Sequence, residues 1–192
     1  MKKAILSIAV LSALGFSAVT QAAPTVGATG MINFTGSINA DSCVAHSNGA
    51  GTSGGANLTF DMNAVSKTAL GTEANPNASS GTSSTLPVPM NLALECSSGT
   101  SVDLKLTPTI ASGKGIGLAP VAGAATNVQI MLMQAGQPLD FTSGSVTLNA
   151  PLVNGVASVP LTAYYTLKSG KTVADVTAGT ANASAAYVLS YN

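Results

Sequence analysis

The chain has 192 residues, of which 46% are hydrophobic and only 7% are charged. Seven lysines are balanced by seven acidic residues, and there is no arginine. This composition excludes a nucleic-acid-binding protein, because no basic patch could neutralise phosphates. It also excludes a disordered chain, because so much apolar surface can be buried on folding. One domain is expected at this length.

The first 22 residues have the pattern of a secretory signal peptide. Lys2 and Lys3 form a positive start, residues 4–19 are apolar, and Thr20-Gln21-Ala22 provides a small-residue cleavage site. A membrane anchor is the alternative, but an apolar stretch of about 16 residues is shorter than the roughly 20 that a span needs. We therefore predict that residues 1–22 are removed and that the rest of the chain is exported.

Export determines the expected oxidation state of the two cysteines, Cys43 and Cys96. They are the only pair in the chain, so in an oxidising compartment they are expected to form one disulfide. A metal site would need more ligands, and His46 is the only histidine among scattered carboxylates. We therefore predict a structural disulfide and neither a metal nor a cofactor.

Short segments after the signal peptide alternate between apolar and polar residues, which is typical of β-strands. Glycine, proline, asparagine and serine separate these segments, and helical spacing is almost absent. Several short strands with frequent turns predict an all-β sandwich. The expected strands are 32–38, 57–62, 88–94, 102–106, 128–133, 145–148, 157–165 and 183–191.

The connections between the segments carry turn chemistry and no catalytic set. Residues 46–56 and 71–85 are rich in Ser, Gly, Asn and Thr and are expected to be exposed loops. Asn154-Gly155 predicts a β-hairpin turn. The acidic residues form no close pair, and His46 falls in the first polar loop, so we predict no enzyme.

The two ends of the exported chain are alternating segments with no obvious partner. Residues 32–38 come just before Cys43, and residues 183–191 run to the end of the sequence. A terminal strand is often simply an edge strand of its own sheet. The alternative is β-augmentation, in which a strand from another chain pairs with the exposed edge.

Taken together and in this order along the chain, these features resemble the pilins assembled by the chaperone–usher pathway, most closely the major subunits of type 1-like fimbriae. The resemblance covers essentially the whole exported chain, although the loops 46–56 and 71–85 are longer than usual in that family. The matching features are the arm 30–36 before Cys43, the alternating segment 88–94 before Cys96, the runs 125–130 and 136–139, the penultimate Tyr191, and Gly179 at the fourteenth position from the end.

The resemblance implies an incomplete immunoglobulin-like β-sandwich that lacks its last strand and is completed by donor-strand exchange. It divides the chain into the signal peptide 1–22, a donor-strand arm 23–38 and a pilin domain 39–192. In the fibre the arm would enter the groove of a neighbouring subunit, with Gly36 where the family keeps a glycine for a shallow pocket. The donor residues that it implies are Ile32, Phe34, Gly36 and Ile38.

The resemblance also implies partners and a location. The partners are other pilin subunits in a homopolymer, a periplasmic chaperone and an outer-membrane usher, and the extracellular fimbrium could contact a host surface receptor. A minor adapter subunit of the pilus tip and a secreted β-sandwich binding module remain as alternatives. The residues of the C-terminal strand expected to face the chaperone or usher are Gly179, Tyr187, Leu189, Tyr191 and Asn192.

Overall fold

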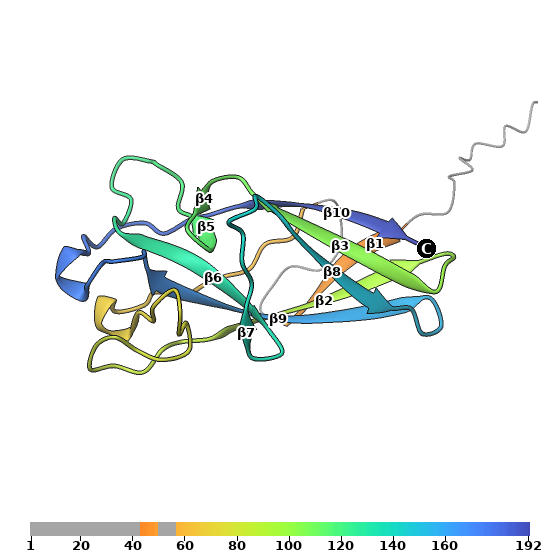
Figure 1. Ribbon diagram of the computed structural model, residues 1–192, viewed down its shortest axis with the longest axis horizontal. Coiled ribbons are helices and arrows are strands. Elements are labelled where there is room, and N and C mark those ends of the chain that lie inside the picture. The colour runs from red at the N-terminus through yellow and green to blue at the C-terminus, as the bar shows by residue number, and fades with distance from the viewer. Residues whose placement is uncertain (1–42, 50–56) are drawn as a thin grey trace, which may run out of the picture. The chain divides into compact units, whose positions relative to one another are not determined.

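The structure of the protein is a computed structural model, and it describes residues 43–49 and 57–192 (Figure 1). The signal peptide 1–22, the arm 23–38 with its predicted strand, and residues 50–56 of the first polar loop lie outside the described residues. The described residues all belong to one compact unit, Asn39–Asn192.

Two antiparallel sheets face each other. The larger sheet has the order β1 (Cys43–Gly49), β2 (Val88–Cys96), β9 (Val156–Leu167), β6 (Val128–Gln134), β5 (Gly115–Gly117) and β4 (Ala111–Ser112), with β7 (Gln137–Pro138) paired to β6. The smaller sheet has the order β10 (Ala185–Tyr191), β3 (Ser101–Pro108) and β8 (Val146–Pro151). The prediction of an all-β sandwich is confirmed.

Alternating side chains build the core between the sheets. Val102, Leu104 and Leu106 of β3 point inward and are buried, and their neighbours along the strand are more exposed. Leu94 and Phe141 are fully buried among them. Because every second residue of a strand faces the same side, the alternating apolar positions of β3 reach this core as expected.

Helical structure in the described part of the chain consists of two single 3-10 turns, η1 (Lys67–Ala69) and η2 (Val173–Asp175). Neither is long or apolar enough to cross a membrane.

The disulfide joins Cys43 of β1 to Cys96 of β2, which are directly opposed in the antiparallel register. It therefore fixes the start of β1 against the end of β2. β1 continues along β2 as far as Gly49, with His46 opposite Ala93. The expectation that His46 lies in a loop was wrong, because pairing with β2 holds this Ser- and Gly-containing segment in a strand.

Residues 71–85 form a loop that is mostly exposed, as expected, but the first part of this loop packs on the larger sheet. Gly71 accepts a hydrogen bond from the backbone N–H of Leu167 and donates one to the backbone oxygen of Tyr165, so it occupies a position beside β9. Pro76 is fully buried. The side-chain amide of Gln129 on β6 donates to the Glu73 carboxylate at 3.1 Å. Hydrogen bonds and one buried proline thus hold the start of the loop against the sheet.

Two other predictions needed correction. The tight turn at Asn154-Gly155 is present, with positive φ at both residues and Val153 opposite Val156. Its flanking strands β8 and β9 nevertheless lie in different sheets, so they do not pair with each other beyond the turn and do not form the expected β-hairpin. Residues 57–62 keep their alternating burial but form only an isolated bridge at Phe60 instead of a strand.

Candidate strand-binding groove

A long groove runs between two extended segments that come from opposite ends of the domain sequence. One wall is residues 57–65, and the other is residues 178–187, which include the first part of β10. Within the described residues, no strand of the chain lies between these walls, because β10 pairs only with β3. The groove has a volume of about 1410 Å³. That exceeds the roughly 300–1,000 Å³ of sites for small molecules and suits an extended peptide.

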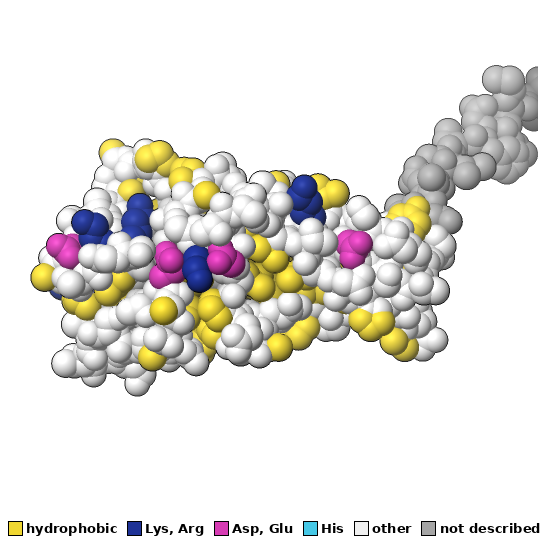
Figure 2. Space-filling view, viewed as in Figure 1, with side chains coloured by type: hydrophobic (Ala, Val, Ile, Leu, Met, Phe, Trp, Pro, Cys, Tyr) yellow, Lys and Arg dark blue, Asp and Glu magenta, His cyan; other side chains and the backbone are white. Residues whose placement is uncertain are grey.

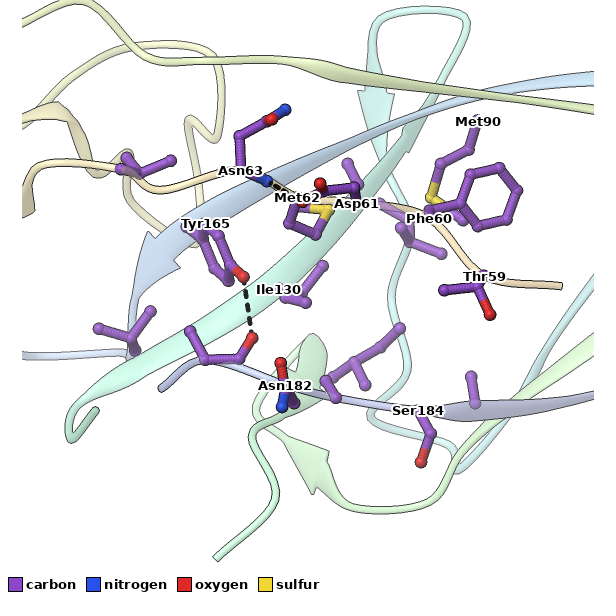
Figure 3. A pocket seen from close by; sticks show the side chains of 18 of the residues that line it. Thr59, Phe60, Asp61, Met62, Asn63, Met90, Ile130, Tyr165, Asn182 and Ser184 are labelled. Carbon is purple, nitrogen blue, oxygen red and sulfur yellow. Dashed lines mark hydrogen bonds between the residues drawn. The ribbon is translucent and has the colours of Figure 1, made fainter. Parts of the chain in front are cut away.

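Alternating apolar side chains line both walls. Leu58, Phe60 and Met62 are half-buried on the first wall, and Phe60 lies close to Met90 (Figure 3). Even after folding, these side chains keep part of their surface exposed along the groove. The half-buried residues of the opposite wall and β10 are Ala183, Ala185, Tyr187 and Leu189. The floor consists of Leu92, Leu104, Leu106, Ile116, Ile130, Leu132, Leu161 and Ala163.

This arrangement is chemically suited to binding a β-strand. β10 is the edge strand of its sheet, and edge strands offer backbone N–H and C=O groups to a strand from another chain. A strand that entered the groove would place every second side chain on the apolar floor. Main-chain hydrogen bonds would then supply affinity, and the fit of alternate side chains would supply specificity.

Tyr165 of β9 lines the groove toward the end away from the disulfide. Its hydroxyl donates a hydrogen bond of 2.8 Å to the backbone oxygen of Ala181 (Figure 3). Burial raises the pKa of Tyr165, and the negative charge of Asp61 raises it further. The Asp61 carboxylate itself accepts a hydrogen bond of 2.8 Å from the backbone N–H of Asn63.

Gly179 lies in the same wall, where two backbones come unusually close. A Cβ at this position would meet the carbonyl oxygen of Gly123 and would come within 2.7 Å of the backbone of Ala124. Thr180 donates to the Gly123 oxygen at 2.9 Å and accepts from Ala125 at 2.8 Å, which holds the two segments together. Packing thus gives a physical reason for a glycine here.

The predicted site residues are distributed unevenly around the groove. Gly179 and Tyr187 line it, whereas Leu189 packs on the core beyond its end. Tyr191 is 37% exposed, and the backbone oxygen of Asn192 accepts a hydrogen bond of 2.6 Å from the backbone N–H of Thr100. The predicted donor residues Ile32, Phe34, Gly36 and Ile38 lie outside the described residues. The sequence analysis did not assign Tyr165 or Met90 to a binding site. Their spacing along a strand does not indicate that they line a groove.

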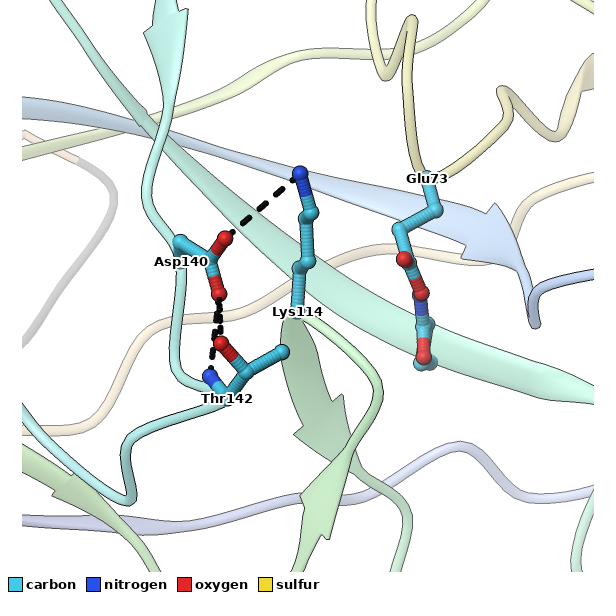
Figure 4. Close-up of polar contacts among 5 residues, drawn as sticks. Glu73, Lys114, Asp140 and Thr142 are labelled. Atoms are coloured by element: carbon cyan, nitrogen blue, oxygen red, sulfur yellow. Dashed lines mark hydrogen bonds and ion pairs between the residues drawn. The ribbon is translucent and has the colours of Figure 1, made fainter.

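Charged residues form no comparable site. The face shown in Figure 2 is mostly uncharged, with a short row of acidic and basic side chains near its middle. Lys114 lies 3.5 Å from Asp140, whose pKa is lowered by hydrogen bonds from Thr142 and by the nearby lysine (Figure 4). Among the described residues, no three His, Cys, Asp or Glu side chains come together to hold a metal.

The fold and the groove define an all-β sandwich with an open edge, the incomplete immunoglobulin-like class of domain. A family model described as fimbrial protein matches residues 32–192, so the chain belongs to the fimbrial protein family. The chain is therefore a subunit of a pilus and assembles with other pilin subunits.

Solved structures share this fold. A chaperone–usher pilus studied for the molecular basis of rod uncoiling is 21% identical, with a TM-score of 0.50, over 88% of this chain and 100% of that one. The P pilus rod subunit PapA is 24% identical, with a TM-score of 0.48, over 71% and 94% of the two chains. The CupB6 tip adhesin from Pseudomonas aeruginosa is 17% identical, with a TM-score of 0.45, over 54% of this chain but only 30% of its own. No curated protein matches the chain.

Proposed function

We propose that this pilus subunit polymerises by donor-strand exchange, in which the arm 23–38 of one copy enters the groove of the next. The observation that carries the proposal is the apolar groove between residues 57–65 and 178–187. The arm supplies Ile32, Phe34 and Ile38 at alternating positions, with Gly36 among them. Burying the three large side chains contributes about 1.5–3 kcal/mol each.

The subunit needs protection of this groove before it polymerises. Exposed apolar surface and a free sheet edge favour aggregation. We infer that a strand of a periplasmic chaperone occupies the groove after residues 1–22 are removed, and that an outer-membrane usher accepts the complex. β10, with Tyr187, Leu189 and Tyr191, would lie beside the chaperone strand, together with Gly179 before it and Asn192 after it.

The polymer formed in this way is an extracellular fimbrium. Each copy contributes one arm and one groove, which are different surfaces, so association is heterologous and yields a filament. We assign the chain a structural role in the shaft, with contact to a host surface through the assembled fibre, and no catalytic role.

Thermal unfolding with an added peptide tests the proposal. The exported chain without residues 23–38 is purified with its disulfide intact and is heated with and without a synthetic peptide of those residues. At a free peptide concentration of about 100 times Kd, we expect stabilisation by about 2.7 kcal/mol. The matched control peptide carries Phe34→Asp and should have little effect. A truncated domain that is fully stable and ignores both peptides would instead favour a secreted binding module.

A further inference from the structure

Three exposed valines lie in one row on the outer face of the larger sheet, at the end that holds the disulfide. Val44 of β1 is directly opposite Glu95 of β2, and Glu95 is directly opposite Val156 of β9. Val153, across the Asn154-Gly155 turn, forms a bridge with Val156. Because directly opposed residues have their side chains on the same face, these four residues form a continuous row, which we call the valine row.

The valine row keeps much of its apolar surface in contact with water. The exposed fractions are 43% for Val44, 41% for Val156 and 66% for Val153. The Glu95 carboxylate lies 3.5 Å from the His46 imidazole at the side of the row, so its charged group has a partner there. Val153 and Val156 are a bridged pair, and Val44 lies on the other side of Glu95. Single exposed apolar residues are ordinary on a protein surface, whereas exposed apolar residues that are grouped together mark interaction sites.

Chain connectivity indicates what covers the row. Val44 follows Cys43, and Ile38 precedes Cys43 by only five positions. Five residues of fully extended chain span at most about 18 Å. A copy whose groove held Ile38 would therefore lie within that distance of Cys43. Three strand spacings separate Val44 from Val153, about 14 Å, so the row lies largely within that reach.

We propose that the valine row is a second contact between consecutive copies of the chain, on which the copy that receives the arm packs. This inference rests on the proposed donor-strand exchange, since only the seated arm brings the next copy to this surface. Burial of the row would fix the angle between neighbouring domains, which a connection through residues 39–42 alone would leave adjustable. The row would thereby contribute to the stiffness of the fibre as well as to its stability.

Photo-crosslinking in assembled fibres of the full chain tests the contact. A photoreactive residue replaces Val153 in one variant and Leu86 in the control variant. Leu86 is similarly exposed, at 48%, but lies just before β2, at the end of that strand away from Cys96, and lines neither the row nor the groove. We expect covalent dimers between consecutive subunits from position 153 and a yield several-fold lower from position 86. Equal yields from the two positions would overturn the proposal.

A double variant provides the second readout. Val153→Thr with Val156→Thr should leave the unfolding temperature of the isolated subunit nearly unchanged, because both side chains are already exposed in it and threonine adds no charge opposite Glu95. Fibres of this variant should dissociate several-fold faster, because each threonine replaces a methyl group in the contact by a hydroxyl group. Fibres as durable as those of Leu86→Thr would overturn the proposal.

The two levels of inference fail in different ways. If donor-strand exchange is wrong, the peptide of residues 23–38 will not stabilise the truncated domain. If only the valine row is wrong, that peptide will stabilise it and fibres will form, but position 153 will crosslink no better than position 86.

Discussion

The hydroxyl of Tyr165 donates a hydrogen bond to the backbone oxygen of Ala181 at 2.8 Å, and this bond ties one wall of the groove to the larger sheet. Tyr165 belongs to β9 of the larger sheet, whereas Ala181 lies in the wall 178–187 and precedes β10. That wall needs a fixed position over the larger sheet if a strand is to fit beside it. This bond holds the wall in place near the end of the groove away from Cys43.

Tyr165→Phe should therefore weaken both the domain and its binding of the arm. The change removes one hydrogen bond from a half-buried site, which costs about 0.5–1.5 kcal/mol. Urea unfolding of the truncated domain measures the first effect, and titration with the peptide of residues 23–38 measures the second. Tyr164→Phe is the matched control, because the neighbouring side chain points to the opposite face of β9. Equal losses in the two variants would show that the bond has no special role.

The same tyrosine predicts how stability depends on pH. Burial and Asp61 raise the pKa of Tyr165 above its usual value of 10.0, so the folded state keeps a proton that the unfolded state loses. The unfolded state then binds fewer protons, and stability must fall as pH rises above about 10. This contribution is fully present below that pH. Unfolding in urea from about pH 8 to 11 should show a smaller decline for Tyr165→Phe than for the parent, and identical declines would contradict it.

Strand positions could be predicted from the sequence where one face of a strand packs on the core. The segments 88–94, 102–106 and 157–165 alternate because burial selects apolar residues at every second position. The same rule failed for 46–49, where composition indicated a loop. Pairing with β2 stabilises a strand there, and this partner lies more than forty residues further along the chain.

The groove was predictable in outline only. Alternation predicted both 57–62 and 183–191 as strands, and only 183–191 was also recognised as a terminal segment with no obvious partner. The juxtaposition of the two segments depends on the sandwich topology, which brings them to the same side of the domain. The contact of Tyr165 with Ala181 had no signal in the sequence, because the two residues are 16 positions apart and the acceptor is a backbone oxygen.

Gly36→Val tests the arm. If Gly36 enters a shallow part of the groove, a valine there would collide with the floor and should slow or block polymerisation. The subunit's own fold should be intact, since residue 36 precedes the pilin domain expected over 39–192. Fibre yield and the unfolding temperature of the monomer measure the two effects. Ser37→Val is the matched control, because the next side chain along a strand faces the other way. Normal fibre yield from Gly36→Val would remove the assignment of Gly36 as a donor residue.

Gly179→Ala tests the wall itself. The added methyl group would overlap the Gly123 carbonyl oxygen, so the segment would have to move away from residues 123–125. Overpacking of this kind typically costs 1–3 kcal/mol, by order of magnitude about 2 kcal/mol. The shift would also displace Thr180 and the wall that continues to β10, so we expect lower stability together with weaker peptide binding. Ala178→Ser, at an exposed neighbour, is the control for the general effect of a substitution in this segment. If Gly179→Ala unfolds at the same urea concentration as Ala178→Ser, then close backbone packing is not the reason for the glycine, and a role in contacting the chaperone or usher becomes the better explanation.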